Sequence, residues 1–593
     1  MNLKYSRVTL LLAIASFFFS VACTNSEKNK YSDSRTSDFP KAISFDFVSK
    51  DTTWKSLTLR EKIGQTMIIR AYYNEHAKQF GSIANMMKKY PVGGIFVPDW
   101  KFLYVPPREN VISNIKDKVA QYEVASRFPL IITEDFERGV GSTYFEYTHM
   151  PSLMALGATN RPDLAKRFGN GIAKESSTLG INWLLHPVVD LNMHPLQNLV
   201  IERSISDDVN RAYPLLKSQI EGMKDAGVVA TIKHFPGDGA TMKNQHFITS
   251  ANNLSMSEWK ESFGTLFQEL INDGTPCIMV GHIRFPAYQK EKINGITPPA
   301  TLSSELMQVL LKEKMKFNGV IMSDALNMGG VGGYYKNEME TAVESFKAGV
   351  DLVLWPDLAY MDTVEARINR GEIPMSRLDD AVERIWGVRE KYDLLKKNKD
   401  VFKDLSSNEE IDIKSTAQEV ANNAVTLLVD EHNEIPLSPK NNKSIAIVNL
   451  SQIDRTPELQ YTAKLLEAKG FKVDTLIHNP IFFEWQSKLD FFEKYDKVIV
   501  AFENRYFNPL GASMLKDKEA LGLWTMGMLP QSKIIAISYS NPYYVNFYFD
   551  SAPIRINAYS IDEFSQKAVV DALTGDIDFK GTSPVRLDFD FFR

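Results

Sequence analysis

The sequence predicts an α/β protein with an N-terminal TIM (β/α)8 barrel and a second, smaller doubly wound α/β sandwich domain. The chain has 593 residues, which is too many for one hydrophobic core. Short apolar runs alternate with longer amphipathic segments from about residue 60 to 360, and a second alternation of this kind begins near residue 416. The composition, 44% hydrophobic and 24% charged, is typical of a soluble globular protein.

The first 22 residues have the pattern of a signal peptide. Lys4 and Arg7 precede an uncharged apolar run that ends at Ala22 and is too short to cross a bilayer comfortably. Cys23 follows directly, an arrangement that resembles a bacterial lipoprotein processing site. We therefore expect an exported protein, periplasmic or an outer-membrane lipoprotein of a Gram-negative bacterium, with Cys23 lipidated and residues 23–45 forming a polar tether. The alternative is a cleaved signal with an unmodified cysteine.

The barrel is predicted over residues 46–395. Its apolar runs are nearly continuous, which indicates strands buried on both faces of a parallel sheet covered by helices. The eight expected strands are 66–70, 94–99, 130–135, 181–186, 228–234, 277–282, 319–324 and 350–356, and expected helices include 161–179, 210–226, 256–273 and 303–316. The carboxyl ends of barrel strands form the active-site face. Here those ends carry Asp99, Asp135, His186, Lys233, His234, His282 and Asp324.

The second domain is predicted over residues 416–593, after a charged linker at 396–415 that lacks apolar periodicity. Expected strands are 444–450, 472–477, 497–502, 533–539 and 554–558, and expected helices are 416–426, 458–469, 483–494 and 562–574. This alternation is typical of a doubly wound sheet. The segment has no Gly-x-Gly-x-x-Gly loop, so no nucleotide is expected.

The chemistry is concentrated in Lys233-His-Phe-Pro-Gly-Asp-Gly239, with Asn244-Gln-His246 shortly after it. A strand that ends in lysine and histidine before a Gly-rich loop indicates the mouth of a site, because both side chains are costly to bury without partners. Asp324 ends another buried strand, where an aspartate is either a helix N-cap or a nucleophile. A carboxylate beside a group that can donate and accept a proton is the pair of side chains that glycoside cleavage requires.

Other classes of function are disfavoured. The formal charge is −5 and no basic stripe is present, which argues against nucleic acid as a partner. The histidines are scattered over different strand ends without ligand spacing, so we expect no metal and no cofactor.

Several segments, in the right order, resemble glycoside hydrolase family 3, specifically its β-N-acetylglucosaminidase (β-hexosaminidase) branch. They are the Lys233–Gly239 motif, Gly180-Ile-Asn-Trp-Leu-Leu-His-Pro-Val-Val-Asp190, Glu202-Arg-Ser204, Val320-Ile-Met-Ser-Asp-Ala-Leu326, Ala424-Val-Thr-Leu-Leu428, Ile435-Pro-Leu437, Asp571-Ala-Leu573 and Ser583-Pro-Val585. The resemblance implies an exo-glycosidase that removes terminal β-linked N-acetylglucosamine with retention, from cell-wall muropeptides or other amino-sugar glycans.

The resemblance also implies roles for individual residues. Asp324 matches the nucleophile that forms a covalent glycosyl-enzyme, and His246 matches a histidine acid/base on the loop after the Lys-His motif. Four residues match those that grip the sugar: Asp135, Arg203, Lys233 and His234. For His186, His282 and Asp190, a packed supporting role remains an equal alternative.

Two positions depart from the family pattern. Asn244 stands where an aspartate usually orients the histidine and stabilises the imidazolium, although Asp238 is a neighbour that could substitute. Thr143 stands near the place of a usual arginine, which leaves specificity open at that edge of the sugar. Three alternatives therefore remain: a β-glucosidase-type enzyme with its acid/base in the second domain, for example Glu503; a phosphorylase; and a glycan-binding lipoprotein impaired at Asn244.

Overall fold

The computed structural model describes residues 40–103, 110–197, 199–397, 400–451, 455–476, 485–503 and 517–588, all within one compact unit, Phe39–Arg593. The predicted signal peptide and Cys23 lie outside the described residues. Within the described part of the chain, no helix combines the length and the apolar character needed to cross a bilayer.

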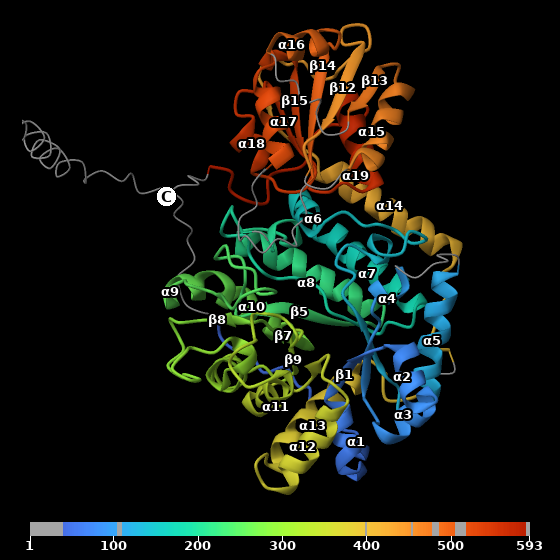
Figure 1. Ribbon diagram of the computed structural model, residues 1–593, viewed down its shortest axis with the longest axis vertical. Coiled ribbons are helices and arrows are strands. Elements are labelled where there is room, and N and C mark those ends of the chain that lie inside the picture. The colour runs from blue at the N-terminus through green and yellow to red at the C-terminus, as the bar shows by residue number, and fades with distance from the viewer. Residues whose placement is uncertain are drawn as a thin grey trace, which may run out of the picture. The chain divides into compact units, whose positions relative to one another are not determined.

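The first part of the chain is an eight-stranded parallel barrel, as predicted (Figure 1). The strand order is β10-β1-β2-β3-β4-β5-β7-β9, and a parallel bridge between Met322 and Leu352 connects the two outer strands. The strands are β1 (Met67–Arg70), β2 (Gly94–Phe96), β3 (Ile131–Glu134), β4 (Trp183–Leu184), β5 (Val229–Phe235), β7 (Cys277–Val280), β9 (Val320–Ser323) and β10 (Val353–Leu354). Each lies within or overlaps a run predicted from the sequence.

Helices surround this sheet. They are α1 (Leu59–Gln65), α2 (Tyr73–Phe80), α3 (Ile83–Lys89), α4 (Trp100–Leu103), α5 (Val111–Ala125), α6 (Leu153–Thr159), α7 (Pro162–Thr178), α8 (Val209–Asp225), α9 (Met256–Trp259), α10 (Thr265–Asn272), α11 (Glu338–Ala348), α12 (Ala359–Asn369) and α13 (Met375–Lys391). One of them, α4, begins at the cavity described below. A π-helical turn, Lys260–Gly264, joins α9 to α10, so the predicted helix 256–273 is present with one irregular turn. The predicted helix 303–316 is π-helical over Glu305–Lys314.

The second sheet has six strands in the order β11-β16-β15-β14-β12-β13, and several of them lie side by side in Figure 1. The strands are β11 (Thr426–Asp430), β12 (Ser444–Asn449), β13 (Lys472–Leu476), β14 (Lys497–Phe502), β15 (Ile534–Ser538) and β16 (Ile554–Asn557). The helices are α14 (Ser407–Ala424), α15 (Thr456–Ala468), α16 (Trp485–Glu493), α17 (Asp517–Gly527), α18 (Tyr544–Tyr548) and α19 (Glu563–Thr574). Only β11 is antiparallel to its neighbour among these described strands.

The predicted charged linker over 396–415 includes the first turns of a helix, which its lack of apolar periodicity did not indicate. Helix α14 begins at Ser407, and a capping box fixes that start: the Ser406 hydroxyl accepts from the backbone N–H of Glu409, whose carboxylate accepts from Ser406. The segment is rich in charge because this helix presents a polar face, so apolar periodicity alone underestimated it.

Candidate active site

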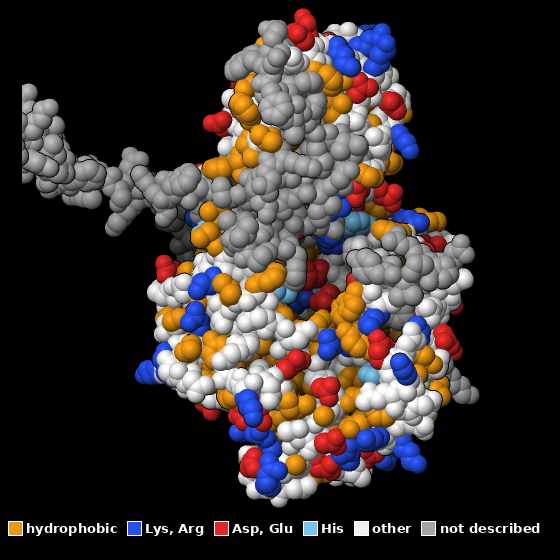
Figure 2. Space-filling view, in the orientation of Figure 1, with side chains coloured by type: hydrophobic (Ala, Val, Ile, Leu, Met, Phe, Trp, Pro, Cys, Tyr) orange, Lys and Arg blue, Asp and Glu red, His pale blue; other side chains and the backbone are white. Residues whose placement is uncertain are grey.

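A cavity of about 730 Å³ lies where the carboxyl ends of the barrel strands converge. Its polar lining includes Asp135, Glu137, Arg203, Lys233, His234, His246, Asp324 and Asn327, and its apolar lining includes Trp100, Leu185, Leu199, Phe247, Met279, Met328, Leu354 and Trp355. Figure 2 shows a hollow in which acidic, basic and histidine side chains gather beside hydrophobic ones. The structure therefore brings together the six side chains predicted to attack, to carry the proton and to grip the substrate.

Asp324 follows β9 and is only 9% exposed. One carboxylate oxygen accepts from the backbone N–H of Ala325 at 2.7 Å, and the other lies 3.8 Å from Nε2 of His234. Burial opposes ionisation of this carboxyl, but the rings of His234, His282 and His246 and the Ala325 N–H together hold its pKa below the usual value. Asp324 is thus an ionised carboxylate in the cavity, which is the state that a nucleophile requires.

His246 is oriented by Asn244, the residue that replaces the usual aspartate. Oδ1 of Asn244 accepts from the backbone N–H of His246 at 3.0 Å, which fixes the orientation of the amide, and it lies 2.9 Å from Nδ1 of the ring. Because that oxygen is an acceptor, Nδ1 carries the hydrogen in the neutral ring and Nε2 carries the lone pair. Asn244, not Asp238, is therefore the Nδ1 partner.

The protonation state of His246 follows from its burial. Loss of solvation lowers the pKa of the ring to about 4, although Asp324 partly opposes this shift. At neutral pH the ring is neutral, so it is ready to accept a proton but rarely has one to donate.

Three of the residues predicted to grip the sugar form a charged network with Glu137, a member that sequence reasoning missed. Lys233 Nζ lies 2.6 Å from Asp135 and 2.8 Å from Glu137, and Arg203 makes two bonds of 2.7 Å to Glu137. Burial opposes ionisation of Glu137, but Arg203 and Lys233 hold its pKa well below the usual value. The one signal for Glu137 was its position two residues after Asp135, just past the end of β3.

A second network holds the Lys-His motif in place. Asp190 is buried, and its carboxylate accepts from Nδ1 of His234 at 2.7 Å and from the backbone N–H groups of His234 and Asp238 at 3.1 and 2.7 Å. This arrangement directs Nε2 of His234 toward Asp324. Burial and the nearby Asp190 raise the pKa of Asp238 to about 7.

The remaining sequence candidates have supporting contacts. His282 is buried between the Thr301 hydroxyl at 2.8 Å and the Ala325 carbonyl at 2.9 Å, and His186 is buried against Gln219. Glu503 follows β14 in the second sheet, is buried, and pairs with Arg455 at 2.7 Å. It is not part of the cavity lining, which disfavours it as the acid/base.

Thr143 lines a smaller hollow of about 220 Å³ that shares Trp100, Asp135 and Glu137 with the main cavity. Burial, opposed by its bond to the backbone N–H of Trp100, raises the pKa of Asp99 in this hollow. Thr143, near the position where an arginine was expected, therefore borders open space beside Asp135 and Glu137.

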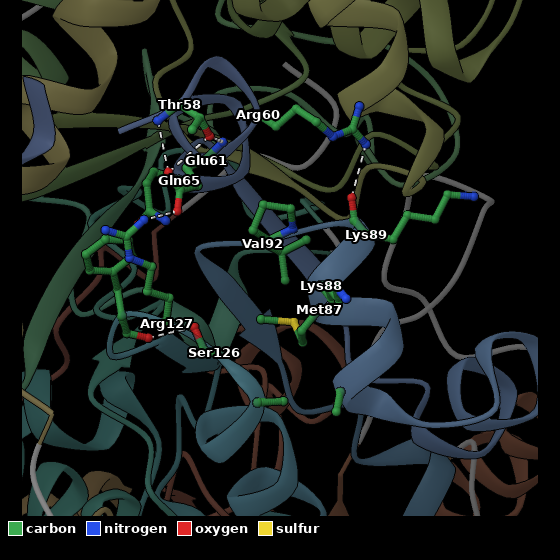
Figure 3. Close-up of a pocket in the computed structure, with 14 residues that line it drawn as sticks. Thr58, Arg60, Glu61, Gln65, Met87, Lys88, Lys89, Val92, Ser126 and Arg127 are labelled. Carbon is green, nitrogen blue, oxygen red and sulfur yellow. Dashed lines mark hydrogen bonds and ion pairs between the residues drawn. The ribbon is translucent and has the colours of Figure 1, made fainter. Parts of the chain in front are cut away.

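A further hollow, of about 370 Å³, lies at the opposite end of the barrel (Figure 3). It is lined by α1, the end of α3 and residues that precede β2 and β3, at the amino ends of the strands. Its two arginines pair with protein groups: Arg127 with Glu61, and Arg60 with Glu365 and the Lys89 carbonyl. This lining has no histidine and no carboxylate pair, so it has the character of a structural face.

No group of three or more His, Cys, Asp or Glu side chains is placed to hold a metal ion within the described ranges.

Comparisons with known proteins bear on the family and the fold. The family described as "Glycosyl hydrolase family 3 N terminal domain" matches residues 58–388. A β-N-acetylglucosaminidase/β-glucosidase of Cellulomonas fimi is 27% identical over 557 residues, covering 90% of this chain and 94% of the relative. The structure of a β-glucoside phosphorylase bound to 2FGlc superposes with a TM-score of 0.78 at 28% identity, covering 90% of this chain and 95% of that one. A family 3 β-N-acetylglucosaminidase from Paenibacillus sp. str. FPU-7 shares the fold, with a TM-score of 0.74 at 24% identity over 90% of this chain and 99% of that one.

Proposed function

The chain belongs to glycosyl hydrolase family 3 and acts on carbohydrate, and from this premise we propose that it is a retaining exo-glycosidase that releases terminal β-linked N-acetylglucosamine. The observation that carries the proposal is one cavity that holds an ionised Asp324 and a His246 ring anchored through Nδ1, beside the Lys233 network. The β-N-acetylglucosaminidase/β-glucosidase of Cellulomonas fimi, similar over most of both chains, supports the choice of sugar.

In the proposed mechanism an oxygen of Asp324 attacks the anomeric carbon, and the bond from that carbon to the leaving oxygen breaks. The leaving oxygen takes a proton from Nε2 of His246. In the second half, water gives a proton to the same nitrogen while its oxygen attacks the anomeric carbon and releases Asp324. In this proposal the sugar hydroxyls are held by Lys233, Arg203, Asp135 and His234. The lysine and the arginine can only donate hydrogen bonds, so they bind the oxygen atoms of the hydroxyls.

Phosphate is a second candidate for the acceptor in the second half. An anionic phosphate oxygen attacks without losing a proton, and the neutral His246 adds no negative charge to repel it. Similarity to a β-glucoside phosphorylase at 28% identity supports this alternative. The product would then be a sugar 1-phosphate.

Trapping with a 5-fluoro glycosyl reagent, followed by peptide mass mapping, tests the mechanism. We expect the label on Asp324 and no label in Asp324→Asn. Nitrophenyl N-acetyl-β-glucosaminide should be turned over faster than nitrophenyl β-glucoside, and added phosphate should change the product only if phosphate is the acceptor. Sugar binding with neither label nor turnover would instead support the impaired glycan-binding protein.

We also propose that the protein is an exported lipoprotein anchored through Cys23, a residue outside the described part of the chain. The support is the sequence alone: an apolar run after Lys4 and Arg7 that ends directly before Cys23. Metabolic labelling with a radioactive fatty acid should mark the wild-type protein and leave Cys23→Ser unlabelled.

A further inference from the structure

The wall of the site cavity includes an aromatic corner with no role in the mechanism above. Trp100, at the start of α4, and Trp355, directly after β10, both line the cavity and lie edge to face, with ring centroids 5.5 Å apart. Phe96 is buried beneath them, 5.8 Å from Trp100 and 5.0 Å from Trp355. Three rings packed in this way form a rigid surface.

This corner is placed beside the nucleophile. The bridge from Met322 to Leu352 and the bond from the Leu354 N–H to the Ser323 hydroxyl at 2.9 Å set β10 next to the end of β9, which Asp324 follows. The backbone N–H of Trp355 then donates to Ile68 in β1 at 2.7 Å. The corner thus comes from the β10, β1 and β2 side of the barrel.

The polar grip comes from the other half of the barrel. Asp135 and Glu137 follow β3, Arg203 ends the 3-10 helix Ile201–Arg203 after β4, and Lys233 is in β5. A ligand in the cavity therefore meets both charged hydrogen-bonding groups and aromatic carbon.

The surface that Trp355 offers is carbon. Its Nε1 is buried without a hydrogen-bond partner among the described residues, whereas the side chain as a whole is partly exposed and lines the cavity. The Arg70 guanidinium lies 5.6 Å from the ring centroid and the Trp100 and Phe96 rings pack against it. Its φ of 63° is a left-handed conformation rare for a bulky residue, and such positions are concentrated at functional sites.

We infer that Trp355, supported by Trp100, is the stacking face for the sugar ring that Asp324 attacks. A pyranose ring has a polar rim and faces of C–H groups, so it matches a cavity with a charged wall and an aromatic wall. This inference rests on the proposed function for the class of ligand. It adds Trp355 as a residue that determines affinity for the sugar without taking part in proton transfer.

Titration of the inactive Asp324→Asn protein with free N-acetylglucosamine, followed by calorimetry, tests the inference. Adding Trp355→Leu removes the stacking face and should raise the dissociation constant by about tenfold, which corresponds to about 1.4 kcal/mol. Trp355→Phe keeps an aromatic face and should stay within about threefold. In the active enzyme, kcat/KM should fall in the same order.

A merely structural role predicts a different pattern. It predicts that Trp355→Leu lowers the thermal unfolding midpoint through lost contacts with Phe96 and Trp100, relative to the control Trp524→Leu, whose side chain is 56% exposed on α17, and leaves the dissociation constant unchanged. A lowered midpoint with an unchanged dissociation constant would overturn the inference. A second result would also overturn it: an unchanged dissociation constant for the free sugar, with slower turnover only of substrates that have a long aglycone. That result would place the Trp355 ring against the leaving group instead of the sugar that Asp324 attacks.

Failure of the proposed function is seen separately. Absence of turnover in the wild-type protein would contradict the glycosidase mechanism, while the calorimetric titration measures sugar binding whether or not turnover occurs.

Discussion

His246 has a hydrogen-bonding partner that orients its ring but carries no charge. The Asn244 amide accepts from Nδ1 as a carboxylate would, so the geometry of an oriented base is kept. Burial lowers the pKa of the ring to about 4, and an amide supplies no negative charge to restore it. The residue substitution therefore preserves general-base capacity and weakens general-acid capacity.

This imbalance predicts a pH dependence that changes with the leaving group. Cleavage of an N-acetylglucosamine disaccharide requires protonated His246, and the protonated fraction falls as pH rises through a pKa of about 4. We expect kcat/KM for the disaccharide to fall about tenfold per pH unit above about pH 5. Nitrophenolate leaves without a proton, so the nitrophenyl glycoside should show no such fall. Parallel profiles for the two substrates would contradict the assignment of His246 as the acid.

Restoring a carboxylate at position 244 should restore the ability of His246 to act as a general acid. In Asn244→Asp, a negative charge beside Nδ1 favours the imidazolium and raises the pKa of His246. We expect the falling limb of the disaccharide profile to move at least about one unit to higher pH, with about tenfold faster cleavage at pH 7. Asn244→Ala is the control, because it loses the orientation without adding charge and should be slower at every pH. An unmoved limb in Asn244→Asp would mean that another group donates the proton.

At the scale of elements, the strands were predictable because each is an apolar run closed by polar residues, and all eight barrel strands lie in or overlap the predicted segments. Elements whose sequence lacks this change from apolar to polar residues were not predicted. Strand β11 follows α14 after a single residue, Val425, so no break in the sequence separates them. Helix α17 contains two glycines and little periodic charge, and helix α14 begins inside a charged segment.

Helices α7 and α8 lie side by side along the barrel in Figure 1, and glycines allow their close approach. A Cβ added at Gly222 of α8 would lie 1.9 Å from the Lys166 carbonyl oxygen of α7. We expect Gly222→Ala to destabilise the protein by about 1–3 kcal/mol, because the helices must move apart. The thermal unfolding midpoint measures this. Gly527→Ala at the end of α17 has no atom within 4 Å of the new methyl group and should be neutral or up to about 1 kcal/mol more stable. Equal shifts for the two variants would refute the packing argument.

At the scale of the whole molecule, the C-terminal segment is hydrogen-bonded to the barrel. Arg211 of α8 donates to the carbonyl oxygens of Gly157, Ser583 and Thr582 at 2.9, 2.8 and 3.0 Å. The Ser206 hydroxyl also donates to the Pro584 carbonyl at 2.7 Å. One guanidinium thus satisfies the carbonyl oxygens of Gly157 and of Thr582 and Ser583, from segments about 425 residues apart in sequence.

Removing the Arg211 guanidinium should weaken the attachment of the C-terminal segment to the barrel without changing the candidate active site. Arg211→Ala leaves three carbonyl oxygens without their charged donor, each bond contributing about 1.5–3 kcal/mol, so the thermal midpoint should fall. Because Arg211 does not line the cavity, kcat/KM at 25 °C should stay within about twofold of wild type. Arg586→Ala, which removes a bridge to Asp207 from a side chain that is 68% exposed, is the control and should lower the midpoint less. Equal midpoints for the two variants would show that Arg211 is not the main attachment.

The sequence by itself determined the barrel, the second α/β domain and which strand ends carry reactive side chains, because burial on both faces and a charged terminus are local properties of each segment. It also singled out Asn244 beside His246. Only the tertiary structure decided that Glu137 joins Arg203 to Lys233, that the Asn244 amide accepts from Nδ1, and that Trp355 and Trp100 face the same cavity. Trp100 and Trp355 are 255 residues apart, and closure of the barrel alone brings them within 5.5 Å, so no local pattern in the sequence records their contact.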